Sequence, residues 1–282
     1  MEDLQFKIDG PSLKEGVPLP VAISALSSFQ SIVDKTYLVI TDKTRITSLE
    51  REKFYLKATE FKHGSLLTFF DIALQGVQLS LPLVSSLGPQ NIWGLTKDSF
   101  SLLKTVCGAV QTGKTPTYEF NNDGDVNLRI GDENHHYHGP VFQIAKMALP
   151  NYQDLAHLLG HNKLTEISAG QRYNSEHDIY LGKEDRGAFD IPTQIQKETT
   201  ELKCEVFDFN KFKNVGKLSV SISGQEVAPG IYNFSIFGNQ DNVEYIYTLL
   251  KPQVTLFCLV EESISPFGGV AVNKLHITGV GS

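Results

Sequence analysis

Residues 202–209, LKCEVFDF, open the part of the chain whose pattern decides the fold. Apolar and polar residues alternate along this segment, which is typical of a strand with one buried face. The same alternation recurs in later segments, 217–222, 231–237, 254–261 and 270–280. A short helix is predicted at 242–250, and three strands, a helix and two strands are the order of an OB-type barrel. The sequence therefore predicts a small OB-like β-barrel over 201–282.

The N-terminal part combines helical spacing with strand alternation. Apolar residues at helical spacing predict a helix from Pro20 to about Ile40, and residues 54–59 and 66–74 alternate as the strands of a hairpin. One helix over an antiparallel sheet buries both apolar faces. The other predicted elements are a strand at 4–8, two core helices within 72–110, a hairpin at 118–120 and 126–130, a third strand at 135–138, and short helices at 140–149 and 152–159.

The predicted fold class is α+β, with an N-terminal helix-on-antiparallel-sheet domain followed by a small OB-like β-barrel domain. A polar stretch from Gly182 to Thr200 separates the two patterns and is typical of a linker. The expected boundaries are 1–181 for the α+β N-terminal domain, 182–200 for the linker and 201–282 for the barrel.

Composition bears on the compartment and on the partners. The 282 residues carry a net charge of −7, which opposes nonspecific attraction to nucleic acid or to an anionic membrane. Cys107, Cys204 and Cys258 lie far apart in apolar stretches, as expected for reduced and buried thiols. The first residues also lack the apolar core of a signal peptide, so a cytoplasmic location is predicted.

The most apolar region of the chain is 72–110. Pro82, Lys97 and Asp98 interrupt it before the roughly 20 apolar residues of a spanning helix accumulate, so no transmembrane segment is expected. Residues 79–95 are nevertheless unusually apolar, and an exposed patch of this kind marks a contact with a partner. We expect a homo-oligomer or protein-partner interface here, with membrane contact as the alternative. The interface candidates are Leu83, Leu87, Ile92, Trp93 and Leu95, with Trp93 as the anchor.

Residues 108–115, GAVQTGKT, satisfy the phosphate-loop pattern G-x-x-x-x-G-K-[ST]. A phosphate loop requires a buried strand before the glycine-rich turn and a helix that begins at the Lys-Thr pair. Here helical spacing precedes the motif and Pro116 follows it, which predicts a helix that ends near Gly113. Lys114 and Thr115 are therefore interpreted as a decoy motif, no nucleotide-binding residue is predicted, and no cofactor is expected.

Eight histidines raise the question of a metal site. Strand alternation places His136 and His138 on one face, and His157 and His161 have the spacing of neighbours on a helix. A zinc centre also needs a third ligand and supporting hydrogen bonds, and the sequence indicates neither. No metal ligand is predicted.

The sequence contains no recognisable arrangement for covalent catalysis. It has no G-x-S-x-G elbow, Ser65 falls in a predicted hairpin turn, and Cys107 is expected in the core. The adjacent carboxylates Glu261 and Glu262 point to opposite faces of a strand. No catalytic residue is predicted, and a metal-dependent or nucleotide-dependent hydrolase remains the enzymatic alternative.

An OB-like barrel also raises the alternative of single-stranded nucleic-acid binding, in which bases stack on aromatic side chains beside a basic groove. The aromatic residues available for this are Phe207, Phe209, Phe212, Tyr232, Phe234 and Phe237, with Lys211 and Lys213 beside Phe212. Residues 201–282 hold six lysines and no arginine against eight carboxylates, a net charge of −2. This total charge favours a barrel used for docking or assembly over one that binds nucleic acid.

Several stretches resemble a family of mostly bacterial two-domain proteins. They are FKIDGPSL at 6–13, SSFQSIVDK at 27–35, FKHGSLLTF at 61–69, EVFDFNKFKNVGKL at 205–218 and NKLHITGV at 273–280. The resemblance implies an α+β N-terminal unit joined to a small C-terminal barrel, and it implies no activity and no catalytic residues. Proteins that resemble this one occur in variable parts of bacterial genomes, where antiviral defence genes are common, so a defence role is an association.

The sequence predicts a non-catalytic cytosolic bacterial protein that acts through macromolecular binding or self-assembly. A place in a defence or stress system follows only from the resemblance.

Overall fold

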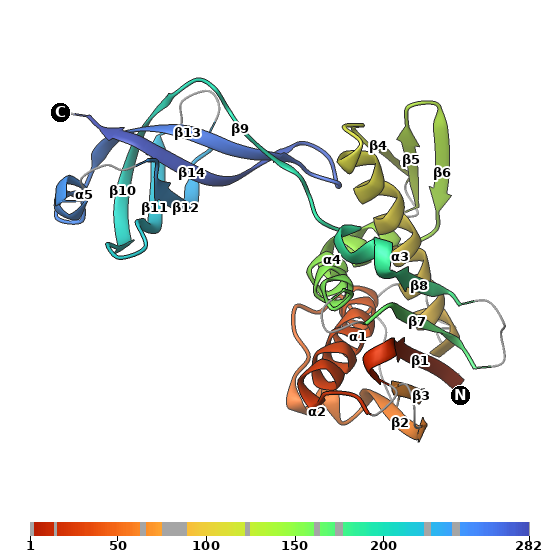
Figure 1. The fold of residues 1–282 in the computed structure, drawn as a ribbon. Helices are drawn as coiled ribbons and strands as arrows, with labels where there is room; N and C mark the ends of the chain where they lie inside the picture. The colour runs from red at the N-terminus through yellow and green to blue at the C-terminus, as the bar shows by residue number, and fades with distance from the viewer. Residues whose placement is uncertain are drawn as a thin grey trace. The chain divides into compact units, whose positions relative to one another are not determined.

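The computed structural model describes residues 3–13, 16–62, 66–74, 89–121, 125–160, 164–172, 177–222, 227–238 and 243–281. The chain divides into two compact units, Met1–Asp190 and Ile191–Ser282 (Figure 1). The first unit combines helices with antiparallel sheets, and the second is a barrel. The predicted α+β class and the OB-like barrel are confirmed.

The main sheet of the first unit is antiparallel throughout and has the order β2-β3-β1-β7-β8. Its strands are β1 (Asp3–Asp9), β2 (Phe54–Lys62), β3 (Leu66–Leu74), β7 (Glu166–Gln171) and β8 (Ile179–Gly182). β1 lies at the centre, and its alternate residues Leu4, Phe6 and Ile8 are fully buried. The alternation read from the sequence is therefore the core face of the central strand.

Helices cover this sheet. They are α1 (Leu19–Ile40), α2 (Ser48–Arg51), α3 (Pro89–Gln111) and α4 (Val141–His157), with short 3-10 turns at Pro11–Leu13 and Lys183–Gly187. Phe29 of α1 stacks on Phe6 of β1, with 4.6 Å between the ring centroids. Trp93 of α3 contacts the Phe29 ring edge-on, with 6.2 Å between the centroids. This aromatic cluster joins two helices to the central strand, and such pairs stabilise a core beyond the area they bury.

A small antiparallel sheet, β4-β5-β6, completes the first unit. Its strands are β4 (Thr117–Phe120), β5 (Val126–Ile130) and β6 (Glu133–Tyr137). On β5 the residues Val126, Leu128 and Ile130 are buried, whereas Asn127 and Arg129 between them are exposed. The exposed face of this sheet is therefore polar.

The second unit is a closed barrel with the strand order β10-β11-β12-β14-β13, in which β13 pairs back to β10. Its strands are β10 (Thr200–Asn210), β11 (Val215–Ile222), β12 (Gly230–Ile236), β13 (Val254–Ile264) and β14 (Val270–Val280). β12 and β14 are parallel, and the other pairs are antiparallel. Helix α5 (Val243–Thr248) lies between the third and fourth strands and contributes the buried Tyr245 to the barrel core. This is the OB topology that the sequence predicts.

All three cysteines are free and buried, as predicted. Burial raises the pKa of Cys107, Cys204 and Cys258 to about 12 in each case. The thiols are therefore protonated at neutral pH and serve as small apolar core groups.

Some predicted elements differ from the structure. Residues 141–157 form one helix that contains Pro150, where two short helices were predicted, because the buried side chains keep their helical spacing past the exposed proline. β7 was not predicted, although it pairs with the central strand β1 and buries Ile167 and Ala169. Of the helical region expected at 72–110, α3 accounts for the part from Pro89, and residues 75–88 lie outside the described part of the chain.

The predicted linker, 182–200, belongs largely to the two units. The chain divides after Asp190, and the preceding residues are held by the first unit, since Phe189 is fully buried and Gln111 donates to the carbonyl oxygens of Gly187 and Asp190. Beyond the division, β9 (Thr193–Ile195) pairs with β13 of the barrel. A composition signal finds this polar segment, but the contacts decide to which unit each residue belongs.

We expect the fragment 191–282 to fold on its own, because its buried core is formed by its own strands and α5. A fragment that begins at Glu201 lacks β9 and should unfold at a lower temperature, since the edge of β13 loses its partner. Circular dichroism with thermal unfolding of the two fragments tests this. A longer fragment that is insoluble or unstructured would show that the barrel needs the first unit to fold.

Candidate functional site

An open groove of about 520 Å³ lies on the outer surface of the barrel. Its polar lining consists of three lysines, three asparagines and one carboxylate: Lys213, Lys217, Lys274, Asn210, Asn233, Asn273 and Asp208. These residues come from β10, β11, β12, β14 and the β10–β11 turn, so the groove is assembled from segments that are far apart in the sequence.

Strand alternation explains why three of these side chains face outward. Leu218, Phe234 and Leu275 are buried in the barrel core, so their neighbours Lys217, Asn233 and Lys274 lie on the outer face. Lys217 and Asn233 are direct cross-strand partners in the β11–β12 pair. Phe234, one residue along, pairs with Leu275 of β14. The registers of both pairs therefore place Lys217 on β11 and Lys274 on β14, the two strands that flank β12, with both side chains on the outer face.

A close backbone approach forms one wall of the groove. A β-bulge at Phe207 shifts the β10–β11 register, so that Val206 pairs with Leu218 and Asp208 with Lys217. Gly216 stands beside it, where an added Cβ would lie 2.1 Å from the carbonyl oxygen of Asp208 and 2.7 Å from the Phe234 ring. Only glycine fits this position without displacing β10 or Phe234.

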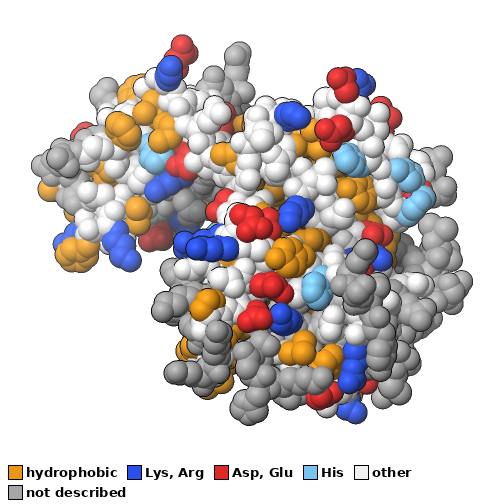
Figure 2. Space-filling view, turned by 45° about the vertical axis from the view of Figure 1, so that its right-hand side comes forward, with side chains coloured by type: hydrophobic (Ala, Val, Ile, Leu, Met, Phe, Trp, Pro, Cys, Tyr) orange, Lys and Arg blue, Asp and Glu red, His pale blue; other side chains and the backbone are white. Residues whose placement is uncertain are grey.

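The β10–β11 turn presents an exposed aromatic ring at the end of the groove. Asn210 holds the turn, because its side-chain oxygen accepts hydrogen bonds from the backbone N–H groups of Phe212 and Lys213 at 3.1 and 3.2 Å. Phe212 is 89% exposed, and the Lys211 ammonium lies 5.3 Å from the centre of its ring. In Figure 2, lysine and hydrophobic side chains lie together on the lower edge of this unit. The turn therefore displays an aromatic ring with one ammonium group beside it.

Charge is distributed unevenly over the barrel. Of the six lysines in 201–282, four lie in the groove or on its turn, Lys211, Lys213, Lys217 and Lys274, whereas Asp208 is the only one of the six described carboxylates that lines it. Among the described residues, no salt bridge engages Lys213, Lys217 or Lys274. The groove is locally cationic although the unit as a whole is acidic, and such a local field attracts anions.

A second polar arrangement lies on the same outer face. Ser235 Oγ is 3.0 Å from His276 Nδ1, and His276 Nε2 is 2.6 Å from a carboxylate oxygen of Glu261. Serine, histidine and carboxylate in this order form a nucleophile–base–acid chain. No sequence motif indicates this arrangement, because the three residues lie on β12, β14 and β13 and meet only through the strand registers.

The aromatic residues predicted for the barrel divide by exposure. Phe212, Phe207 and Phe237 are exposed at 89%, 49% and 48%, whereas Phe234 is buried in the core. Phe209 and Tyr232 are partly buried against the same core, and Phe209 stacks on Phe234. Only the first three rings are therefore available to a ligand.

The phosphate-loop motif lies at the end of a helix, as predicted. α3 ends at Gln111, and Gly113 adopts a left-handed conformation with φ of 74°. The N–H groups of Gly113 and Lys114 donate to the carbonyl oxygens of Val110 and Ala109 at 2.9 Å, which is a Schellman cap. These two N–H groups satisfy the helix end, so they do not point toward a phosphate.

The predicted interface residues differ in how deeply they are buried. Ile92 and Trp93 are core residues of the first unit, at 0% and 1% exposure, and Trp93 Nε1 donates to Asp178 at 2.7 Å. Trp93 therefore offers no surface to a partner, which corrects its predicted role as the anchor. Leu95 is half-buried, and Leu83 and Leu87 lie outside the described residues. No described helix is long and apolar enough to cross a membrane.

The histidines also separate into groups. His136 and His138 lie together with Asp125, a residue that the sequence did not connect to them. His157 ends α4 and lies 2.8 Å from Asp190, and His161 is outside the described residues. The predicted pair of His157 and His161 on a helix therefore cannot be compared with the structure. The pair of His136 and His138 lies together, with Asp125 beside it.

The chain matches no family model, no curated protein and no solved structure.

We expect Gly113→Ala to lower the free energy of unfolding by about 1 kcal/mol, because a left-handed backbone costs a side-chain-bearing residue that amount or more. Lys114→Ala, at the adjacent exposed position, should leave stability unchanged, since its cap hydrogen bond uses the backbone. Urea unfolding of both variants tests the cap. ATP or GTP binding at micromolar concentration that disappears in Lys114→Ala would contradict our interpretation of the motif.

Proposed function

We propose that the C-terminal barrel binds single-stranded nucleic acid along the groove between the β10–β11 turn and β14. The observation that carries this proposal is the convergence of three lysines on one groove, next to a turn that carries Lys211 and the exposed ring of Phe212. OB folds bind oligonucleotides on the face of their second and third strands and on adjoining loops. In this barrel those strands are β11 and β12, and they supply Lys217 and Asn233.

Each group has a defined role in this proposal. Lys213, Lys217 and Lys274 neutralise successive phosphates, and Asn233 and Asn273 offer amide donors and acceptors to sugars or base edges. Phe212 supplies a face on which a base stacks, a contact that is worth roughly 1–3 kcal/mol per base. Because stacking and phosphate contacts tolerate any base, we expect weak sequence preference.

The net charge of −7 does not oppose this binding at close range. Charges beyond about 8 Å are screened at physiological ionic strength, so the local lysines dominate the field inside the groove. Three neutralised phosphates on a single strand correspond to a slope of about −2 in log K against log salt. The counterions released by these lysine–phosphate contacts should make binding sensitive to salt.

The chain of Ser235, His276 and Glu261 is better explained as part of this polar surface than as a catalytic triad. Acyl transfer needs backbone N–H donors beside the nucleophile to stabilise an oxyanion. Here the N–H groups of Ile236 and Phe237, which follow Ser235, donate to the carbonyl oxygens of Asn214 and Ile277 at 2.9 and 2.8 Å. These N–H groups are already hydrogen-bonded to backbone carbonyl oxygens, so they are not free to stabilise an oxyanion, which argues against a hydrolase at this position.

We expect the full-length protein to bind a fluorescent single-stranded oligonucleotide, and Phe212→Ala to weaken binding about tenfold through loss of one stacking contact. Lys213→Glu should weaken it further and reduce the salt slope by about one. Fluorescence anisotropy across a salt series measures both effects.

Two matched controls accompany these variants. Tyr247→Ala removes another exposed ring, at α5, and Lys203→Glu reverses another exposed lysine, on β10 outside the groove lining. Both should retain wild-type affinity. If Lys203→Glu and Lys213→Glu lose the same amount of affinity, the loss depends on the total charge of the protein, and a site specific to the groove is excluded.

A second candidate function is assembly, which the sequence favoured. The observation that supports it is the apolar surface around α5, where Tyr247 is 60% and Leu250 79% exposed while the helix buries only Tyr245 and Thr248. Exposed apolar residues gathered in this way mark protein contacts. This surface and the remaining candidates Leu83, Leu87 and Leu95 would serve a homo-oligomer or a protein partner in the cytoplasm.

If the chain assembles through α5, the wild type should have a native mass above that of one chain, and Leu250→Asp should lower it without loss of fold. Light scattering after gel filtration measures the mass, and Lys251→Ala at the next exposed position is the control. A wild type that stays monomeric at high micromolar concentration would leave the α5 surface without this role.

A further inference from the structure

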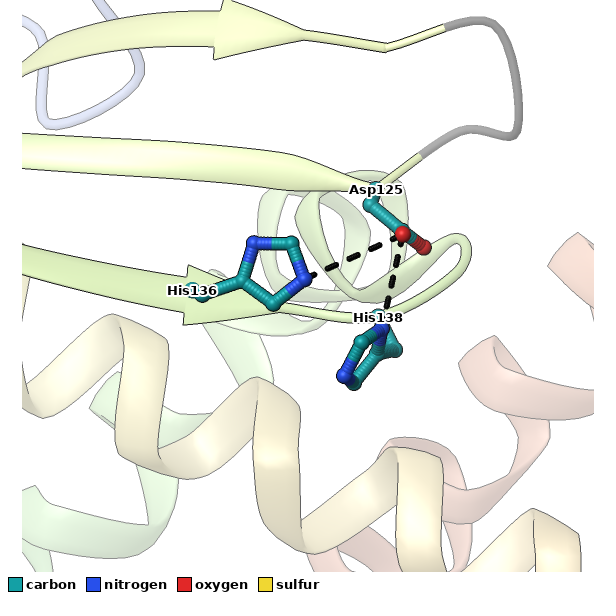
Figure 3. Close-up of side chains that lie close together, drawn as sticks. All are labelled: Asp125, His136 and His138. Carbon is teal, nitrogen blue, oxygen red and sulfur yellow. Dashed lines mark hydrogen bonds and ion pairs between the residues drawn. The ribbon is translucent and has the colours of Figure 1, made fainter.

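Asp125, His136 and His138 meet on the small sheet of the first unit (Figure 3). Asp125 precedes β5, His136 lies on β6, and His138 follows it. The Asp125 Oδ2 atom is 3.8 Å from His136 Nε2 and 3.4 Å from His138 Nδ1, and all three donor atoms lie within 4.8 Å of one another. Both imidazole rings thus turn a nitrogen toward the same carboxylate.

A neighbouring amide orients the His136 ring. His136 Nδ1 lies 2.6 Å from the side-chain oxygen of Asn127, its cross-strand partner on β5. An amide oxygen accepts hydrogen bonds only, so the proton of a neutral imidazole resides on Nδ1. The lone pair of Nε2 then points toward Asp125. Hydrogen bonding of the distal nitrogen is the feature that fixes metal-binding histidines.

The Asp125 carboxylate is held in place as well. Its Oδ1 accepts a hydrogen bond from the backbone N–H of Gly139 at 2.7 Å, and Oδ2 accepts one from the Asn121 side chain at 3.2 Å. Gly139 has φ of 64°, a conformation that glycine adopts without strain and that aims its N–H group at the carboxylate. The carboxylate is therefore oriented before any ligand arrives.

We propose that Asp125 Oδ2, His136 Nε2 and His138 Nδ1 form a binding site for a divalent transition-metal ion of the zinc class. Two imidazoles and one carboxylate are a donor set that zinc accepts, with ligand bonds of about 2.0–2.2 Å. Such bonds place tetrahedral ligands about 3.4 Å apart, close to the two carboxylate–imidazole distances of 3.4 and 3.8 Å. The side chain of His138 is 80% exposed, so it can close on the ion without disturbing the core.

The site leaves coordination positions open. Three protein ligands on an exposed strand end leave room for water or for a donor from another molecule, as in zinc sites that are not purely structural. The site lies in the first unit and does not involve the barrel groove, so it does not depend on the proposed nucleic-acid binding.

The competing explanation is a set of ordinary ion pairs between Asp125 and protonated histidines. His157 beside Asp190 provides the matched case, because its side chain is 51% exposed and has a carboxylate oxygen at 2.8 Å without a second histidine as partner in the described part of the chain. Metal binding distinguishes the two arrangements, because a single imidazole–carboxylate pair retains an ion far more weakly than three donors do.

The experiment uses the tag-free full-length protein after treatment with a chelator. We expect isothermal titration calorimetry to show one Zn²⁺ per chain, Co²⁺ to give the visible absorption of a low-symmetry site, and Zn²⁺ to raise the melting temperature. His138→Ala and Asp125→Asn should each weaken Zn²⁺ binding at least tenfold, since loss of a ligand removes one of three donors. His157→Ala should bind as the wild type does.

Circular dichroism establishes that each variant is folded, and the exposed His138 makes His138→Ala decisive if Asp125→Asn loses structure. Failure of the wild-type protein to bind Zn²⁺ or Co²⁺ at micromolar concentration overturns the proposal. Wild-type affinity in His138→Ala overturns it equally, as does a loss in His157→Ala equal to that in His138→Ala, because the ion would then be bound elsewhere.

Discussion

Closure of the C-terminal sheet into a barrel is the constraint on which the proposed binding site depends. The pairing of β13 with β10, together with the parallel pair β12–β14, leaves each strand with one face toward a shared core. Because side chains alternate, every buried residue fixes an outward neighbour on the next position. The apolar interior thereby determines where the lysines stand, and Lys217 and Lys274 share one surface although 57 residues separate them in the sequence.

The groove depends equally on a local packing requirement. The bulge at Phe207 and the absence of a side chain at Gly216 let β10 approach β11 next to the Phe234 ring. Beyond that point Asn210 closes the turn and holds Phe212 away from the core. A turn backbone that is hydrogen-bonded before the ligand arrives lowers the entropy cost of binding. The hydrogen bonds of Asn210 thus determine where the Phe212 ring is presented to a base.

The sequence supports prediction where periodicity is long and the burial one-sided. The order of the barrel strands and α5 was read correctly because apolar residues alternate over each strand. The sites were harder to predict, because they depend on register. Lys213, Lys217 and Lys274 are single polar residues on separate segments, and their convergence cannot be read from a total charge of −2. Asp125 likewise reads as a turn residue until the β5–β6 pairing brings it to His136 and His138.

Apolar composition alone misled the prediction at Trp93. An uncharged stretch with one tryptophan suggested an interface, but the indole fits between helix and sheet and its N–H donates to Asp178. Apolar and aromatic residues are common both in a protein core and at the buried centre of an interface, so only the fold separates the two. At Pro150 the sequence predicted a break between two helices. The structure has one continuous helix, because Pro150 lies on the exposed side of α4.

We propose that nucleic acid contacts the outer groove of the barrel. Two-dimensional ¹H–¹⁵N NMR of the full-length protein, titrated with a short single-stranded oligonucleotide, tests it at the level of residues. We expect progressive shifts for the backbone amides of Lys211–Lys217, Asn233 and Asn273–Lys274, with the α5 amides unchanged. Shifts confined to α5 or to the first unit, or no shifts at saturating oligonucleotide, would contradict it.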